Sequence, residues 1–357
     1  RVRDITNPTF TCPTDITVTT DALNCLSSGY FPVPVITDRC SKVTYSVTYN
    51  SGTICGSTTA LTMLPDGATI TKFNDSIYRF EGFPTGNYNF KYRAVDECGN
   101  FTECSTFDIF VRDITAPVPV CRTLSQVSLG SGVCGSARVD AAKFDEGSWD
   151  NCGNVYFKAK RLDPKASSCE NSTLLNDFVN FCCEDTVVNV LLRIYDSAPI
   201  SGTVLDNYRP VNSCGSNYND CVVKVVIEDR VSPIIQCPTN VEISCSAYDF
   251  STPTLNADTA WFNKYFGKVA RQDCSINQNR GLVKVNGIPS QIQEGWAYDN
   301  CTVYIPQTIT SQIEWEVGTI TRTFRSVDKA RRQSTPCTQS IVITNQNPLF
   351  INAGHYT

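Results

Sequence analysis

The sequence predicts an all-β protein of three β-sandwich modules in tandem. Two observations support this prediction: a connecting segment that recurs at a nearly fixed spacing, and short runs of β-branched and aromatic residues between its copies. The segment is an apolar run, an acid and then a proline. Its prolines are Pro8, Pro117, Pro233 and Pro348, which lie 109, 116 and 115 residues apart. Solenoid repeats have units of roughly 20–50 residues, so this period indicates whole domains.

The connecting segments divide the chain into modules. Proline fixes φ and biases the preceding residue toward extended backbone, which makes each segment a short, stiff connector. The 357 residues are ample for domains of about 100–150 residues each. We expect modules at residues 1–115, 116–231 and 232–347, and either the start of a following module or a terminal tail at residues 348–357.

Within the first module, three segments have the pattern of strands. Residues 43–49 are β-branched and aromatic, and residues 87–96 alternate polar and apolar side chains as a half-buried strand does. A turn at Gly99 and Asn100 then leads to a final strand at residues 104–111. Several short strands with frequent turns in about 115 residues favour a β-sandwich.

Composition excludes several classes of protein. The net charge of −5 offers no basic face to a phosphate backbone, so nucleic acid is not expected as a partner. No apolar run approaches the roughly 18 residues that a membrane-spanning helix needs. The chain begins with what looks like the end of a module's last strand and shows no signal peptide, so we expect an interior or processed piece of a longer secreted chain.

Nineteen cysteines predict disulfide bonds and an oxidising, extracellular compartment. Zinc is the alternative reading, but zinc sites want close cysteine pairs, often with histidine. The single histidine is His355, and the adjacent cysteines are Cys182 and Cys183. The pattern therefore favours disulfides in a secreted or cell-surface protein.

The stretch around the predicted strand at residues 87–96 resembles the signature of hyalin repeat (HYR) domains. It has a turn at Pro84 and Gly86, an alternating strand, then Ala94-x-Asp96, the Gly99-Asn100 pair and a cysteine. HYR domains are immunoglobulin-like sandwiches of extracellular proteins, so the resemblance implies that fold and location. The third module has the same sequence pattern at residues 317–328. The second module has the alternating strand at residues 187–196 but lacks the Gly-Asn pair after it.

A second resemblance rests on residues 139–153 of the second module, which end in Asp150-Asn-Cys152. They are similar to the Cys-rich HYR-like repeats of Bacteroidetes surface adhesins, including gliding-motility adhesins. Asp38-Arg-Cys40 and Asp299-Asn-Cys301 hold the corresponding places. The resemblance implies an extracellular adhesive role and names no activity.

The third module carries an insertion at residues 246–298. Part of it, residues 258–270, has the periodicity of a helix with an Asp or Thr near its start as a cap. We expect this helix to cover one end of the sandwich; a surface that binds a partner is the alternative. The aromatic residues on its apolar face are Trp261, Phe262, Tyr265 and Phe266.

Aligned positions in the three modules suggest a frame bond that joins the first strand to the last: Cys12–Cys104, Cys121–Cys221 and Cys237–Cys337. A second bond would be Cys25–Cys40, Cys134–Cys152 and Cys245–Cys301, and elimination leaves Cys55–Cys98. The sequence cannot order the remaining cysteines of the second module, and it leaves one over in the third. These are Cys169, Cys182, Cys183 and Cys214 in the second module, and Cys274 in the third.

Acids recur at the connecting segments and at strand ends: Asp4, Asp113, Asp229, Asp96, Asp196 and Asp328. Calcium between modules would need several such oxygens to converge. The connecting segments lack a dense run of acids, so we expect these aspartates to cap turns and predict no cofactor, with calcium as the alternative.

Two motifs mark candidate glycosylation sites. Asn-x-Ser/Thr occurs at Asn74, Asn100, Asn171 and Asn300. The Bacteroidetes resemblance implies a second motif, Asp-Ser/Thr followed by an apolar residue, which occurs at Ser76, Thr186, Ser197 and Thr259. Thr259 could instead cap the helix.

No active site is expected. A nucleophilic triad needs an oriented base, and the single histidine lies near the chain end. The sequence instead predicts a structural and adhesive protein that forms a stiff rod or filament at the cell surface. A module that binds glycan or protein through its loops or its insertion is the alternative. We expect the axis to continue, through further repeats of the same chain or through end-to-end self-association.

Overall fold

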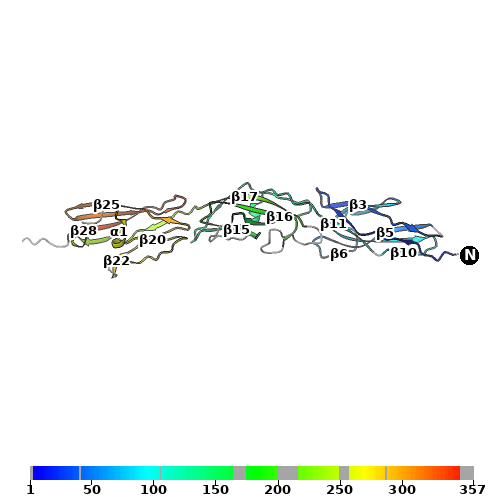
Figure 1. The fold of residues 1–357 in the computed structure, drawn as a ribbon, viewed down its shortest axis with the longest axis horizontal. Helices are drawn as coiled ribbons and strands as arrows, with labels where there is room; N and C mark the ends of the chain where they lie inside the picture. The colour runs from blue at the N-terminus through cyan, green and yellow to red at the C-terminus, as the bar shows by residue number, and fades with distance from the viewer. Residues whose placement is uncertain are drawn as a thin grey trace, which may run out of the picture.

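The computed structural model describes residues 3–39, 42–104, 106–132, 134–163, 174–199, 216–248, 257–285 and 288–345. The chain is almost entirely β and forms three immunoglobulin-like modules, which lie one after another along the long axis (Figure 1). We call residues 9–112, 118–228 and 234–344 the first, second and third modules, residues 113–117 the first joint, and residues 229–233 the second joint.

The first module is a two-sheet sandwich. One sheet has the order β2-β11-β9-β5-β6, with β10 beside β9, and the other has the order β3-β8-β7, while β1 pairs with β4. The strands are β1 (Thr9–Phe10), β2 (Ile16–Thr19), β3 (Leu26–Pro32), β4 (Ile36–Thr37), β5 (Val43–Ile54), β6 (Ala60–Leu61), β7 (Thr69–Asn74), β8 (Ile77–Pro84), β9 (Gly86–Asp96), β10 (Phe101–Glu103) and β11 (Phe107–Arg112).

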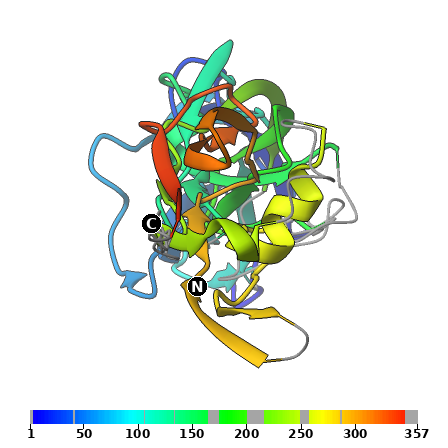
Figure 2. The ribbon, with the colours of Figure 1, turned by 90° about the vertical axis from the view of Figure 1, so that its left-hand side faces the viewer.

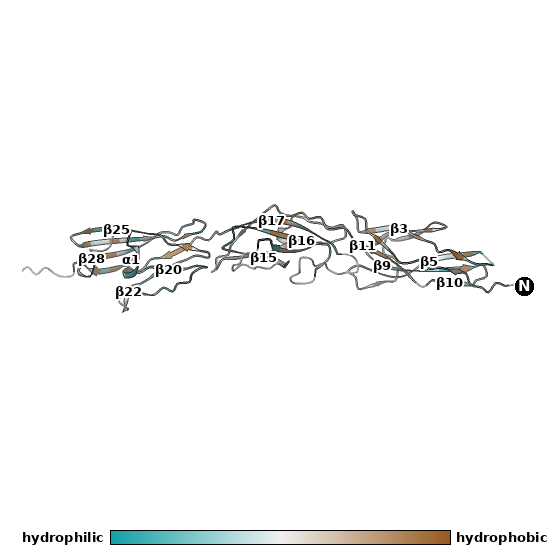
Figure 3. Ribbon diagram, viewed as in Figure 1, coloured by the Kyte–Doolittle hydropathy of each residue, from teal (hydrophilic) through white to brown (hydrophobic). Residues whose placement is uncertain are grey.

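The second module repeats the larger sheet in the order β12-β17-β16-β14 and pairs β13 with β15 as its second layer. Apolar residues concentrate in the strands, including β16 and β17 (Figure 3). The elements are β12 (Leu124–Ser128), β13 (Ser136–Asp140), the 3-10 helix η1 (Ala141–Phe144), β14 (Tyr156–Arg161), β15 (Phe178–Cys182), β16 (Val187–Tyr195) and β17 (Tyr218–Glu228).

The third module has the corresponding sheet β19-β28-β26-β25, and the insertion supplies much of its remaining structure. The hairpin of β21 and β22 projects from the body (Figure 2). The elements are β18 (Ile234–Gln236), β19 (Val241–Ser244), η2 (Cys245–Ala247), α1 (Thr259–Phe266), β20 (Val269–Gln272), β21 (Leu282–Val285), β22 (Ile288–Gln293), β23 (Gly295–Tyr298), β24 (Val303–Tyr304), β25 (Gln307–Glu314), β26 (Val317–Phe324), β27 (Val327–Asp328) and β28 (Cys337–Thr344).

One pairing is common to all three modules. The first strand of the larger sheet lies parallel to the last: β2 beside β11, β12 beside β17 and β19 beside β28. A parallel pair cannot be joined by a tight turn, so the rest of the module must lie between the two strands in sequence. The chain therefore enters a module at one end and leaves it at the other.

The insertion helix is shorter than the sequence predicts, because α1 ends at Phe266 and Gly267 takes a φ of 88°. Phe262 and Phe266 are buried in the core of the third module with Tyr248, Ile320 and Ile341. The helix thus packs against one face of the β19-β28-β26-β25 sheet, whereas the sequence predicts a helix that covers one end of the sandwich.

A buried guanidinium fastens this helix to the sheet. Arg322 on β26 is fully buried and donates hydrogen bonds to the Gly267 carbonyl at 2.9 Å and to the Gln339 side chain at 2.8 Å. It also donates to the side chains of Asn263 and Gln307. Burial lowers the pKa of Arg322 to about 9. The insertion is therefore held by a polar network as well as by apolar packing.

The buried tyrosines of the first module predict that the folded state loses stability at alkaline pH. Tyr88 and Tyr92 are 0% and 1% exposed, and burial raises the pKa of each above the ordinary value of 10.0. Above pH 10 the unfolded state releases phenol protons that the folded state keeps, so stability falls as pH rises. The expected slope is about 1.4 kcal/mol per pH unit for each tyrosine.

Urea unfolding from pH 8 to 11 tests this expectation. Tyr92→Phe should remove one tyrosine's share of the slope, at the cost of the hydrogen bond to the Pro32 carbonyl. Tyr30→Phe is the control, since Tyr30 is 54% exposed. Equal slopes for wild type and Tyr92→Phe would contradict the assignment.

Candidate functional site at the module joints

Among the described residues, three disulfide bonds cross from one module to the next. Cys25 of the first module is bonded to Cys152 of the second, and Cys134 and Cys183 of the second are bonded to Cys274 and Cys301 of the third. We call these bonds the staples. The first joint is crossed by one described staple and the second joint by two.

The structure contains the three predicted frame bonds, Cys12–Cys104, Cys121–Cys221 and Cys237–Cys337. The other predicted pairings are wrong. Cys25 and Cys134 are bonded to a neighbouring module instead of Cys40 and Cys152, and Cys301 is bonded to Cys183 instead of Cys245. Cys98 and Cys245 are the free thiols of the described residues, which excludes Cys55–Cys98 and Cys245–Cys301.

The reason for these errors is positional. The predicted second bonds assumed that cysteines at the ends of a sandwich pair within their own module. Cys25, Cys134 and Cys183 lie at the end that faces the following module, so their bonding partners lie across the joint. Cys274 is not left over, and Cys55 and Cys182 are also disulfide-bonded. Cys40, Cys169 and Cys214 lie outside the described residues.

Hydrogen bonds reinforce the second joint. Asn300 donates from Nδ2 to the Gly130 carbonyl at 3.2 Å and to Asp229 Oδ1 at 3.1 Å, while its own carbonyl accepts from the Gly135 N–H at 2.8 Å. A Cβ on Gly135 would lie 2.7 Å from Asn300 Nδ2, so this close approach requires glycine. Tyr298 adds a hydrogen bond from its hydroxyl to the Ser131 carbonyl at 2.9 Å.

At the first joint, an asparagine at the equivalent position also donates a hydrogen bond to the preceding module. Asn151, which occupies the place of Asn300, donates to the Asp21 carbonyl of the first module at 3.0 Å. Asp113 accepts from the Thr115 N–H at 2.9 Å. Each Asp-Asn-Cys motif therefore supplies an amide and a cysteine that reach the preceding module.

The aspartates that the sequence analysis treated as turn caps gather in three clusters. In each cluster one ligand atom from each of three residues lies within 4.8 Å of the others. The clusters are Asp4, Asp38 and Asp96 at the N-terminal end of the first module; Asp113, Asp150 and Cys152 at the first joint; and Asp229, Asp299 and Asp328 at the second joint.

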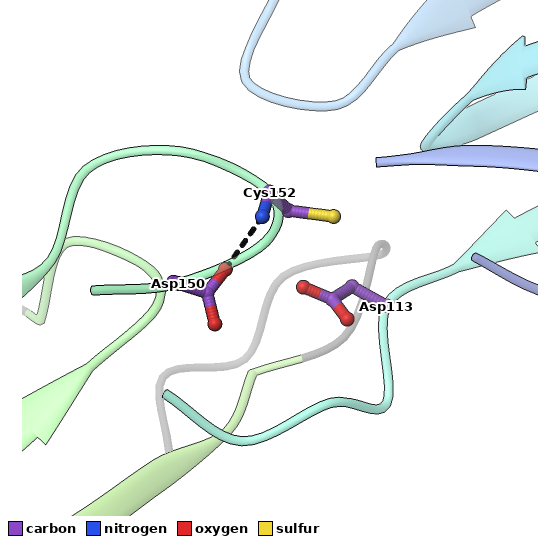
Figure 4. A group of neighbouring side chains, drawn as sticks. All are labelled: Asp113, Asp150 and Cys152. Carbon is purple, nitrogen blue, oxygen red and sulfur yellow. Dashed lines mark hydrogen bonds between the residues drawn. The ribbon is translucent and has the colours of Figure 1, made fainter. Parts of the chain in front are cut away.

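At the first joint the carboxylates of Asp113 and Asp150 face one another, and the Cys152 N–H donates to Asp150 Oδ2 at 2.8 Å (Figure 4). The Cys152 sulfur is committed to its disulfide. Burial, with the neighbouring charges of Asp113 and Asp196, raises the pKa of Asp150 above its ordinary value. Asp196 therefore extends this cluster.

Of the aspartates that the sequence marks, Asp113, Asp196, Asp229 and Asp328 lie at the two joints, whereas Asp4 and Asp96 lie at the N-terminal end of the first module. Sequence reasoning missed Asp38, Asp150 and Asp299, which complete the clusters. The available signal was that an aspartate stands two residues before a cysteine at the same place in each module.

The aromatic residues proposed for binding do not form a free surface. Phe262 and Phe266 are buried in the core, and Trp261 and Tyr265 pack against it half-buried. Burial of this face favours the structural role of the insertion over ligand binding.

The candidate glycosylation residues differ in their exposure. Asn74, Ser76 and Thr186 are exposed, whereas Asn100, Ser197 and Thr259 are half-buried and Asn171 lies outside the described residues. Asn300 is fully buried and its amide nitrogen is hydrogen-bonded. Asn300 is therefore wrong as a glycosylation site, because the folded joint leaves no room for a glycan.

No protein-family model and no curated protein sequence matches the chain. Among solved structures, the I-band fragment I67-I69 from titin covers 96% of this chain and 100% of its own, at 10% identity and a TM-score of 0.30. The SrpA adhesin from Streptococcus sanguinis covers 36% of this chain and 69% of its own, at 21% identity and a TM-score of 0.21.

An endo-fucoidan hydrolase from glycoside hydrolase family 107 covers 96% of this chain and 44% of its own, at 12% identity and a TM-score of 0.22. Similarities of this size identify no family, and the fold assignment rests on the strand order and register of this chain. Within the described residues, no helix has the length and apolar character that crossing a bilayer requires.

Proposed function

We propose that this protein is a structural and adhesive element of the cell surface, whose immunoglobulin-like modules form a stiff rod in an oxidising, extracellular environment. The observation that carries the proposal is the set of disulfide staples across both joints. An enzyme needs a positioned set of reacting groups. The staples instead hold neighbouring modules in one orientation.

The backbone path supports the same function. The chain enters and leaves each module at opposite ends, so a pull on the protein loads the parallel first and last strands in shear. The frame bonds join the segments next to these strands covalently. The HYR resemblance agrees with an extracellular repeat protein, and a Bacteroidetes-type surface adhesin is the finer form of the proposal. End-to-end continuation remains a prediction, since residues 346–357 lie outside the described residues.

Small-angle X-ray scattering tests the role of the staples. The variant that replaces Cys134, Cys183, Cys274 and Cys301 with Ser lacks both staples of the second joint but keeps every frame bond. We expect its modules to stay folded, while its distance distribution broadens and its mean end-to-end length falls. The wild type should scatter as a single elongated particle.

Cys98→Ser is the control for the loss of a cysteine, because Cys98 is an exposed free thiol. Scattering that is the same for the staple variant and the wild type would show that the staples do not set the stiffness. If the wild-type protein scatters as modules joined by flexible linkers, the rod proposal itself is contradicted.

A further inference from the structure

The second joint holds three carboxylates that lie close together, and the residues that carry two of them, Asp299 and Asp328, are buried. Asp299 is 0% exposed and Asp328 is 5% exposed, and one oxygen of each lies within 4.8 Å of the other and of Asp229. Burial, together with the charges of Asp229 and Asp328, raises the pKa of Asp299 to about 6. The fold thus concentrates negative charge where solvent cannot screen it.

Each carboxylate has one oxygen fixed by the main chain. Asp229 Oδ1 accepts from the Val231 N–H at 3.1 Å, Asp299 Oδ2 from the Cys301 N–H at 3.0 Å, and Asp328 Oδ1 from the Arg332 N–H at 2.7 Å. The second oxygens, Asp229 Oδ2, Asp299 Oδ1 and Asp328 Oδ2, are all buried without a hydrogen-bond partner. The turns therefore hold the three carboxylates in place and leave one free oxygen on each.

No side chain in the described ranges neutralises this charge by direct contact. None of the salt bridges involves Asp229, Asp299 or Asp328. Arg332 is the nearby cation, but its guanidinium donates to the main-chain carbonyl of Asp229. A buried carboxylate without a partner costs several kcal/mol, so a cluster of them calls for a cation.

A related arrangement recurs at the N-terminal end of the first module and at the first joint, although both oxygens of Asp96 accept hydrogen bonds. Asp4 Oδ1 accepts from the Thr6 N–H and its Oδ2 is buried without a partner, as in Asp229. Asp150 Oδ1 and Asp196 Oδ1 are likewise buried without partners. At the position of Arg332 the other two modules place Asn100 and Asn217, whose Nδ2 donates to the carbonyls of Asp4 and Asp113.

We propose that Asp229, Asp299 and Asp328 form a calcium site that locks the second joint, and that the other two clusters are its counterparts. Three carboxylates without histidine or free thiolate are ligands for a hard cation. Calcium accepts six to eight oxygens in flexible geometry, whereas magnesium keeps several waters and is seldom held in an all-protein cage.

The ion would join three parts of the chain. Asp229 belongs to the second joint, Asp299 to the Asp-Asn-Cys motif and Asp328 to β27. Asn300 connects the same cluster to Gly130 of the second module. The calcium proposal does not depend on the proposed rod function. Calcium binding can be measured whether or not the protein bears load.

Calorimetric titration of EDTA-treated protein with CaCl2 tests the proposal, with Asp299→Asn as the site variant. This variant keeps an oxygen for the Cys301 N–H but removes the charge. Asp66→Asn is the matched control, because Asp66 is exposed and belongs to none of the three aspartate clusters. We expect Asp299→Asn to bind one calcium ion fewer than the wild type, and Asp66→Asn to bind the same number as the wild type.

Thermal unfolding separates a calcium site from a merely structural aspartate. In EDTA, Asp299→Asn should be at least as stable as the wild type, since it relieves repulsion between like charges. At a calcium concentration about 100-fold above Kd, the wild type should gain several °C that the variant does not gain. An unchanged stoichiometry in Asp299→Asn, no binding by the wild type at millimolar CaCl2, or equal preference for MgCl2 would overturn the assignment.

Discussion

Replacing Arg322 by Met is expected to destabilise the third module by about 3 kcal/mol, because a buried acceptor left without its donor costs about 1–3 kcal/mol and this guanidinium serves several neutral acceptors. The guanidinium is fully buried and donates to groups on α1, β25 and β28 and to the Gly267 carbonyl after α1. Its loss would remove a donor from the buried side-chain oxygen of Gln339 and from the half-buried ones of Asn263 and Gln307. Urea unfolding monitored by tryptophan fluorescence measures the effect, since α1 carries Trp261.

Arg325→Met is the matched control on the same segment. Arg325 is exposed and donates a hydrogen bond to the Gln333 side chain, so its replacement should change stability by less than about 0.5 kcal/mol. Arg322→Lys should recover only part of the loss, because an ammonium lacks the planar fork that reaches several acceptors. A stability for Arg322→Met equal to that of the wild type would refute the fastening role of this network.

Full reduction should lengthen the stretched protein by roughly 300–360 Å for each module that unfolds. The frame bonds enclose segments of 92, 100 and 100 residues, and an extended chain spans about 3.3–3.6 Å per residue. While the bonds are intact, force passes across them and these segments cannot extend. Single-molecule stretching with and without reductant measures the difference.

A variant separates the two kinds of bond. In Cys12→Ser/Cys104→Ser under oxidising conditions, the Cys25–Cys152 staple still carries force from the first module to the second. Only the chain from Cys12 to Cys25, a sequence separation of 13 (25 − 12), should then be released, about 45 Å. A release of the whole 92-residue segment would show that this staple does not bear force. Cys98→Ser should behave as the wild type does.

Sequence reasoning anticipated what is encoded locally. The alternation at residues 87–96 corresponds to β9, and the helical periodicity after Asp258 corresponds to α1. The frame bonds were predictable because Cys104, Cys221 and Cys337 each lie eight or nine residues before the next connecting segment (113 − 104, 229 − 221 and 345 − 337). In these cases the informative residues lie in one segment or at one repeated position.

The joints were harder to predict, because their contacts cross between modules. Spacing alone does not show whether Cys25 faces Cys40 of its own module or Cys152 of the next, and the answer depends on which end of the sandwich it occupies. The aspartate clusters were missed for a related reason. Asp229, Asp299 and Asp328 are separated by up to 99 residues, so no dense acidic run marks the site they form together.

The two joints differ in their number of attachments, and this has a consequence for torque. The first joint is held by the connecting backbone and one described staple, while the second is held by the backbone and two staples. Two bodies attached at two points can still swing about the line through those points, as a door swings on its hinges. A third attachment removes that axis. A twist applied to the third module is therefore transmitted to the second as if they were one piece, whereas the first joint resists the same twist with one described staple and the hydrogen bond of Asn151.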